Sequence, residues 1–164
     1  MVTAHETCPG HHLLDMSRWN LGRVLLRSLE FPLFYEGWAC FAEELMEHTG
    51  YFRGPAQRLL LARRHFLRAI RGKIDLDIQT GRMNLSEAAS CLEDGGINRK
   101  RAASIVRRYA LKPGYQVCYS IGLRRFRNLF ERFGRNNPGD FVQKVLSLGE
   151  IDFDDLEEEL TSSE

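Results

Sequence analysis

The chain has 164 residues, of which 43% are hydrophobic and 27% charged, with a formal net charge of +1. These values are typical of a soluble globular protein that is long enough to bury a core, and they exclude a disordered polyelectrolyte. A net charge near zero provides no overall field to attract nucleic acid, so we expect no nucleic-acid partner despite the Arg-rich middle of the chain. No apolar run approaches the roughly 20 residues that a membrane span needs.

The predicted elements are helical throughout, because Leu, Ala, Arg and Glu dominate and runs of alternating β-branched residues are absent. Asn84 to Glu87 resembles a capping box, and Lys112-Pro113-Gly114 should end one helix and begin the next. We expect one all-α domain over residues 1–164 and no internal repeat. In chain order, the predicted helices cover residues 3–17, 34–48, 55–77, 84–95, 98–109, 114–133 and 137–148, followed by a short acidic helix or frayed tail.

The cysteines and the N-terminal residues indicate the cellular compartment in which the protein is expected. The four cysteines are scattered and form no CxxC pair, which is typical of reduced thiols in a cytosolic protein. The first residues also lack the charged and apolar regions of a signal peptide. We therefore expect a cytoplasmic location.

The most informative stretch is His5-Glu6-Thr7-Cys8-Pro9-Gly10-His11-His12. In zinc hydrolases a helix commonly carries two His at positions i and i+4, with a Glu beside the first that works on the attacking water. Counted from His5, position i+4 is Pro9, which cannot bind a metal. On a regular helix His11 would lie about 240° around the axis, and His12 would lie on the correct face but about 10 Å further along.

Pro9 and Gly10 offer a way to correct this spacing. Proline removes a helical hydrogen bond, and glycine tolerates the backbone dihedrals that follow. A local bulge of two residues would return His11 to the face of His5. We therefore favour His11 as the second metal ligand, with His12 left as a neighbour of the site or a substrate contact.

A zinc site of this kind needs a third protein ligand, for which Glu36 is the best candidate. It lies among apolar and aromatic residues, so its carboxylate should be protonated, paired with an Arg or bound to a metal. Gly37 would allow another backbone to approach closely. Glu43, two turns further on the same face, could orient a ligand imidazole.

Five ordered blocks resemble one family. They are His5 to His12, Glu36 to Glu43, Arg68 to Arg71, Arg108 to Gly114, and Tyr119 to Gly122. The chain resembles the bacterial domain-of-unknown-function family numbered 885, which is similar to the gluzincin-type metallopeptidases. That resemblance implies an all-α fold like the angiotensin-converting-enzyme and carboxypeptidase Taq group, and a Zn²⁺ cofactor.

The resemblance also implies roles for individual residues. Gly10-His11 matches the Gly-His of those relatives with two residues inserted ahead of it, which supports His5, His11 and Glu36 as the metal ligands. By similarity, Glu6 would be the general base that takes a proton from the attacking water. Tyr119 would donate to the oxyanion of the tetrahedral intermediate. Two further residues would line the cleft or bind a substrate carboxylate, namely Arg108 and Tyr109.

Family members usually have a long helical region before the motif, whereas only four residues precede His5 here. The chain is therefore expected to be the C-terminal portion of a larger architecture. Our leading hypothesis is a zinc-dependent metallohydrolase, most simply a peptidase acting on a peptide or peptide-like substrate. The alternative is a truncated, non-catalytic helical module that folds or forms a homo-oligomer without turnover.

Overall fold

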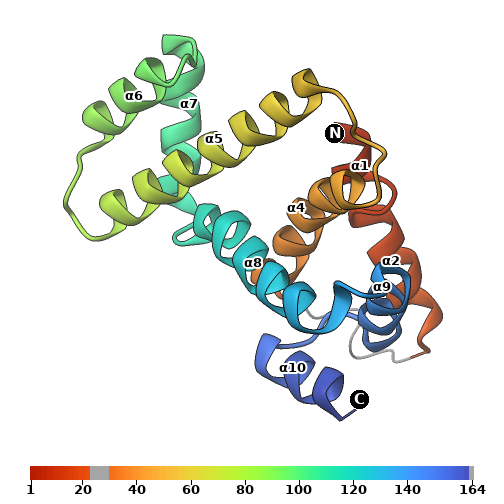
Figure 1. The fold of residues 1–164 in the computed structure, drawn as a ribbon. Coiled ribbons are helices and arrows are strands. Elements are labelled where there is room, and N and C mark those ends of the chain that lie inside the picture. The colour runs from red at the N-terminus through yellow and green to blue at the C-terminus, as the bar shows by residue number, and fades with distance from the viewer. Residues whose placement is uncertain (23–29, 163–164) are drawn as a thin grey trace.

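The computed structural model describes residues 1–22 and 30–162, and within these residues it contains helices and no strand, which confirms the predicted all-α class (Figure 1). None of the described helices combines the length and the apolar character needed to cross a membrane. The helices are α1 (Val2–Glu6), α2 (His11–Asn20), α4 (Pro32–His48), α5 (Pro55–Gln79), α6 (Leu85–Asp94), α7 (Arg99–Leu111), α8 (Tyr115–Leu129), the π-helical turn η1 (Phe130–Gly134), α9 (Pro138–Leu148) and α10 (Phe153–Thr161).

Local signals set most of the helix ends. The Asn84 side chain accepts from the backbone N–H groups of Ser86 and Glu87, and the Glu87 carboxylate accepts from Asn84 N at 2.8 Å, so the predicted capping box is confirmed. Proline occupies the first turn of α4, α5 and α9, where its missing N–H costs nothing. The turn between α7 and α8 lies at the predicted break.

The N-terminal prediction needs a correction. We expected one helix over residues 3–17 with a bulge at Pro9-Gly10, but α1 ends at Glu6 and α2 begins at His11. The two helices are joined by a short loop whose Cys8–Pro9 peptide bond is cis. His5 and His11 therefore come from two helices instead of one face of a single helix.

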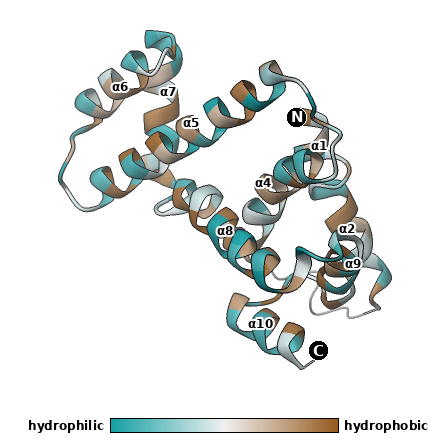
Figure 2. Cartoon of the chain, in the orientation of Figure 1, coloured by the Kyte–Doolittle hydropathy of each residue, from teal (hydrophilic) through white to brown (hydrophobic). Residues whose placement is uncertain are grey.

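The described residues form two hydrophobic clusters. The larger one joins α2, α4, α8, η1, α9 and α10 around stacked aromatic rings, among them Phe41 and Phe126, whose centroids are 5.8 Å apart. The smaller one packs α5 against the α6–α7 pair through Ile74, Leu92 and Val106. Figure 1 shows the α6–α7 pair at one end of α5 and the N-terminal helices beyond the other. Along α5, hydrophilic and hydrophobic residues alternate, as expected for a helix with one solvated face (Figure 2).

Helix α8 connects the two clusters because it packs on both α4 and α5. Its contact with α4 is made through two glycines. A Cβ on Gly37 would lie 2.6 Å from the Gly122 backbone, and a Cβ on Gly122 would lie 2.1 Å from the Leu33 carbonyl oxygen. The expected close approach at Gly37 is confirmed, and it brings the tyrosines of α8 within reach of α4.

Candidate metal centre

Three buried side chains from three helices converge near the N-terminus. His5, His11 and Glu36 each offer one potential ligand atom, and these atoms lie within 4.8 Å of one another. Glu36 Oε2 is 3.5 Å from His11 Nε2 and 3.9 Å from His5 Nε2. The structure thus brings together the three residues selected from the sequence.

The loop between α1 and α2 sets the relative position of the two imidazoles. A Cβ on Gly10 would lie 1.9 Å from the His5 carbonyl oxygen and 2.4 Å from that of Ala4, so only glycine fits against the end of α1. The buried Trp38 indole of α4 donates to Pro9 O at 2.9 Å and to Gly10 O at 3.3 Å. The loop is therefore held against the helix that carries Glu36.

His5 is oriented from behind by an ionic cluster. Its Nδ1 lies 3.0 Å from Glu43 Oε1, and Glu43 is fully buried. The same carboxylate accepts two hydrogen bonds from Arg64 and two from Arg68. Arg68 Nη2 is also 3.2 Å from His5 Nδ1, but it already donates to Glu43 Oε1 at 2.6 Å. We therefore assign the proton to Nδ1, which leaves Nε2 unprotonated and facing Glu36.

The charge state of Glu43 follows from this cluster. Burial alone would raise its pKa, but the hydrogen bonds from His5, Arg68 and Arg64 outweigh burial and hold the pKa far below its ordinary value. Glu43 is a carboxylate at any ordinary pH. The expectation that Glu43 could orient a ligand imidazole is met by its contact with His5.

His11 is positioned by stacking. Its ring lies on the Tyr35 ring with centroids 4.0 Å apart and planes inclined by 18°. Tyr35 is fixed in turn by a hydrogen bond from its hydroxyl to Asp15 at 3.1 Å. His11 Nδ1 is buried and makes no hydrogen bond within the described part of the chain.

Glu36 receives two hydroxyl groups from α8. Tyr115 and Tyr119 both donate to Glu36 Oε1, at 2.6 and 2.9 Å. Burial opposes the ionisation of Glu36, but contacts with His11 and the two hydroxyls outweigh burial and lower its pKa. Burial, together with this carboxylate, raises the pKa of both tyrosines, which therefore stay protonated as donors.

The second carboxylate oxygen of Glu36, Oε2, is the atom that most clearly indicates a bound cation. Among the described residues, buried Oε2 has no hydrogen-bond partner, and it is the oxygen that faces both imidazoles. Tetrahedral ligands about 2 Å from a zinc ion lie about 3.3 Å from one another, which is near the 3.5 Å between Glu36 Oε2 and His11 Nε2, whereas the 3.9 Å to His5 Nε2 is longer. A set of two imidazole nitrogens and one carboxylate oxygen is a donor set of catalytic zinc sites. The residues present fit such an ion.

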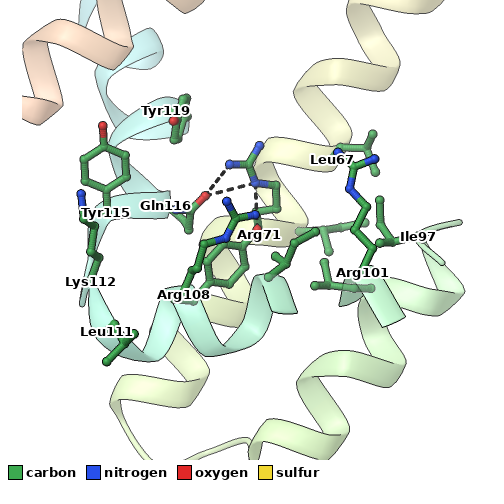
Figure 3. Close-up of a pocket in the computed structure, with 15 residues that line it drawn as sticks. Leu67, Arg71, Ile97, Arg101, Arg108, Leu111, Lys112, Tyr115, Gln116 and Tyr119 are labelled. Atoms are coloured by element: carbon green, nitrogen blue, oxygen red, sulfur yellow. Dashed lines mark hydrogen bonds between the residues drawn. The ribbon is translucent and has the colours of Figure 1, made fainter. Parts of the chain in front are cut away.

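The other predicted residues lie outside this cluster. Glu6 is the last residue of α1, directly after His5, and it is exposed. His12 is exposed too, whereas His11 is 9% exposed and joins the cluster. Arg108 and Tyr109 line a cavity of about 590 Å³ that Tyr115 and Tyr119 also border (Figure 3). The hydroxyl of the buried Tyr109 accepts from Arg71 Nε at 2.9 Å.

Sequence reasoning missed the role of Tyr115 as a second donor to Glu36. Its signal was the spacing, since residues four apart lie on the same helix face and Tyr115 precedes Tyr119 by four. The sequence also suggested no role for Arg64. Arg64 lies one helical turn before Arg68 on α5, and Arg68 begins one of the blocks that resemble the family.

The fold and the cluster together define an all-helical protein with a candidate metal centre of two His and one Glu. Residues 1–160 match the family described as "Bacterial protein of unknown function (DUF885)", and the chain belongs to that family. Its fold is also that of the crystal structure of the putative lipoprotein from Colwellia psychrerythraea, with a TM-score of 0.88 and 24% sequence identity. The match covers 98% of this chain and 29% of that one, so the chain spans under a third of the length of this relative. No curated protein matches the sequence.

Proposed function

We propose that this chain is the metal-bearing part of a zinc-dependent hydrolase. The observation that carries the proposal is that three buried ligand atoms lie within 4.8 Å of one another, and that Glu36 Oε2 accepts no hydrogen bond from the described residues. Leaving a buried carboxylate oxygen unpaired costs free energy, and a cation between the imidazoles would remove that cost.

The donor set favours zinc among the common divalent ions. Imidazole nitrogens with a single carboxylate suit Zn²⁺, whereas Mg²⁺ and Ca²⁺ require mostly oxygen ligands. When bound, zinc supplies Lewis-acid chemistry that activates water and polarises a carbonyl group. His5, His11 and Glu36 would hold the ion, and Glu43 would keep the His5 ring in the required orientation.

The surrounding residues would accept a proton from water and stabilise the negative charge that develops on the substrate. Glu6 follows His5 directly and would accept the proton of the attacking water as a general base. Tyr119, whose raised pKa keeps its hydroxyl protonated, donates to Glu36 in this structure and would turn that hydrogen bond to the negative oxygen that develops during acyl transfer. An amide bond of a peptide or peptide-like molecule is the substrate that the resemblance to gluzincin-type peptidases favours.

The direct test of this chemistry is Glu6→Gln, which keeps the shape of the side chain and removes its basicity. We expect unchanged zinc binding and at least a roughly 100-fold loss of hydrolysis across a peptide library analysed by mass spectrometry. His12→Ala is the matched control, and it should retain both properties. Loss of zinc from Glu6→Gln would contradict the assignment of Glu6 as a base, and undiminished hydrolysis would contradict its role altogether.

A non-catalytic module is the second candidate, and exposed apolar side chains on α5 favour it. Leu59 is 72% exposed and Phe66 is 61% exposed. Apolar groups gathered on a surface often mark an interface with another protein. Self-association that increases with concentration in sedimentation velocity, together with zinc-loaded protein that cleaves no peptide, would favour this candidate.

The cytoplasmic location also stays a prediction.

A further inference from the structure

We infer that the buried carboxylate of Glu150 is a positioning residue of the metal centre, because it joins the helix that carries His11 to the helix that carries Glu36. Glu150 lies in the corner between α9 and α10, far along the chain from both ligands. The inference deepens the proposed function and rests on it, since it concerns the same metal centre. Its evidence is separate, because none of the contacts that carry it is made by a metal-ligating atom.

Glu150 is buried and both its carboxylate oxygens have partners. The residue is 1% exposed. Arg18 donates from Nη1 to Glu150 Oε2 at 2.7 Å, and the backbone N–H of Phe31 donates to Glu150 Oε1 at 2.5 Å. A buried charge that loses its partner is strongly unfavourable, so the fold must keep both contacts to keep this carboxylate inside.

The two partners of Glu150 belong to the two ligand-bearing helices. Phe31 is the N-cap residue of α4, the helix that carries Glu36. Arg18 lies on α2, seven residues after His11 and therefore on the same helix face. Helix α9, which leads to Glu150, packs on α2 (Figure 1). One carboxylate from the C-terminal part of the chain thus holds the start of α4 against α2.

A chain of polar contacts continues from Glu150 to the His11 ring. Arg18 donates from Nη2 to Asp15 Oδ1 at 3.1 Å, and Asp15 Oδ2 accepts from the Tyr35 hydroxyl at 3.1 Å. The Tyr35 ring in turn carries the stacked His11 ring, with centroids 4.0 Å apart. Arg18 is therefore shared between Glu150 and the carboxylate that fixes the stacking platform of His11.

The two imidazoles of the site differ in what holds them. His5 Nδ1 lies 3.0 Å from the Glu43 carboxylate, whereas His11 Nδ1 is buried without a hydrogen bond among the described residues. A metal-binding imidazole usually has such a partner, which fixes the orientation of its ring. His11 depends instead on Tyr35 and on the placement of α2 against α4. Loss of the Glu150 charge should therefore displace His11 and leave His5 in place.

The test follows the imidazole C–H signals of the metal-free protein by NMR, so it needs neither zinc nor turnover. The chain contains five His, whose signals are assigned by single His→Ala substitutions. Tyr35→Leu removes the stacked ring and gives the signal position of an unstacked His11. Glu150→Gln keeps the shape of the side chain and removes its charge. It should move the His11 signals toward that position, and the His5 signals should stay unchanged.

Two variants control for the loss of charge and for the loss of stability. Glu131→Gln removes an exposed carboxylate whose partner is Arg135, and it should leave all His signals unchanged. Val106→Ala removes buried volume from the smaller hydrophobic cluster. It should lower the melting temperature and still leave the His11 signals unchanged.

A second measurement addresses the metal centre itself. Chelator competition should show about 10-fold weaker zinc binding by Glu150→Gln than by the unmodified protein. The visible absorption bands of the Co²⁺-loaded protein should change as well, because they report the geometry of the ligands. Val106→Ala should keep the zinc affinity and the absorption bands of the unmodified protein.

Unmoved His11 signals in Glu150→Gln, or equal movement of the His5 and His11 signals, would overturn the inference. Unchanged zinc affinity beside displaced His11 signals would overturn it too. If Glu150→Gln does not fold, Asp15→Asn breaks the same chain of contacts and must move the His11 signals. Absence of zinc binding by the unmodified protein would remove the proposed function, whereas displacement of His11 in the metal-free variant would still stand.

Discussion

The candidate metal centre and the neighbouring cavity differ in charge balance. Around the metal centre, acidic groups are buried and almost every carboxylate oxygen is paired, Glu43 by two arginines and Glu36 Oε1 by two tyrosines. In the cavity, four cations line the wall and no acid accompanies them. Among the described residues, the first region contains a buried carboxylate oxygen without a hydrogen-bond partner, and the second contains cations without a carboxylate partner.

This difference assigns different ligands to the two regions. A buried acceptor between imidazoles favours a cation, and guanidinium groups without a carboxylate partner favour an anion. Tyr115 and Tyr119 border both regions, so α8 would present one substrate to both. The difference also predicts that the two regions can be damaged separately, which the following substitutions test.

The largest effect is expected from Gly10→Ala. The new Cβ would collide with the His5 carbonyl oxygen, so the loop must move and His11 must leave its place beside Glu36. We expect zinc affinity to fall by more than the roughly 100-fold that loss of an outer partner costs, and stability to fall by about 1–3 kcal/mol. Chelator competition and thermal unfolding measure these two quantities.

Gly139→Ala is the control for that substitution, because a Cβ there meets only the Asn137 side chain at 3.5 Å in helix α9. It should leave zinc affinity unchanged and stability within about 1 kcal/mol. Equal zinc affinity in Gly10→Ala and the unmodified protein would show that the loop does not set the metal geometry.

The next effect is expected from Glu43→Gln, which removes the carboxylate behind His5 and preserves its shape. Zinc affinity should fall about 10- to 100-fold, because the His5 ring loses its charged partner. Anion binding in the cavity should persist, because the described partners of Glu43 are His5, Arg64 and Arg68, and none of them lines the cavity. A joint loss of both properties would contradict the separation of the two regions.

The same substitution predicts a change in pH dependence. Glu43 has a pKa far below its ordinary 4.5, so its stabilising effect is complete above about pH 4.5 and is lost as the pH falls toward the folded-state value. The melting temperature of the metal-free protein should therefore fall more steeply below about pH 4.5 than that of Glu43→Gln. Parallel curves for the two proteins would show that Glu43 is not held ionised by the fold.

The smallest effect is expected from Asn84→Ala in the region of α5, α6 and α7. It removes the cap of α6, which accepts from Ser86 and Glu87, and should cost about 1 kcal/mol of stability. Zinc affinity should not change, since the α6 residues Ala88 and Leu92 belong to the smaller hydrophobic cluster and not to the one around the metal centre. A shift in zinc affinity would mean that the two clusters are coupled through α5. Ser90→Ala, on the exposed face of the same helix, is the control.

Much of this arrangement could be predicted from local sequence signals. Prolines, glycines and the Asn84 cap fixed most helix boundaries, and the odd spacing from His5 to His11 pointed to a distortion at Pro9-Gly10. The form of that distortion could not be predicted, because it depends on the Trp38 indole and on the contact of Gly10 with the end of α1. These are contacts between residues far apart in the chain.

The cavity was harder to foresee for the same reason. Arg71, Arg108 and Tyr119 are spread over three helices, and their meeting follows from the packing of α8 on both α4 and α5. Sequence spacing predicts which residues share a face of one helix, as for Tyr115 and Tyr119, but not which faces meet. The Gly37–Gly122 approach was a long-range contact with a readable signal on one side, since Gly37 suggested a close approach without naming its partner.

The central claim is that His5, His11 and Glu36 form one metal site. Its most direct measurement is the zinc stoichiometry and affinity of the purified protein beside His5→Ala, His11→Ala, Glu36→Ala and His12→Ala, with folding checked by circular dichroism. We predict one zinc per chain, lost in the first three variants and retained in His12→Ala. No zinc in the unmodified protein, or zinc retained without His5, His11 or Glu36, would contradict the account.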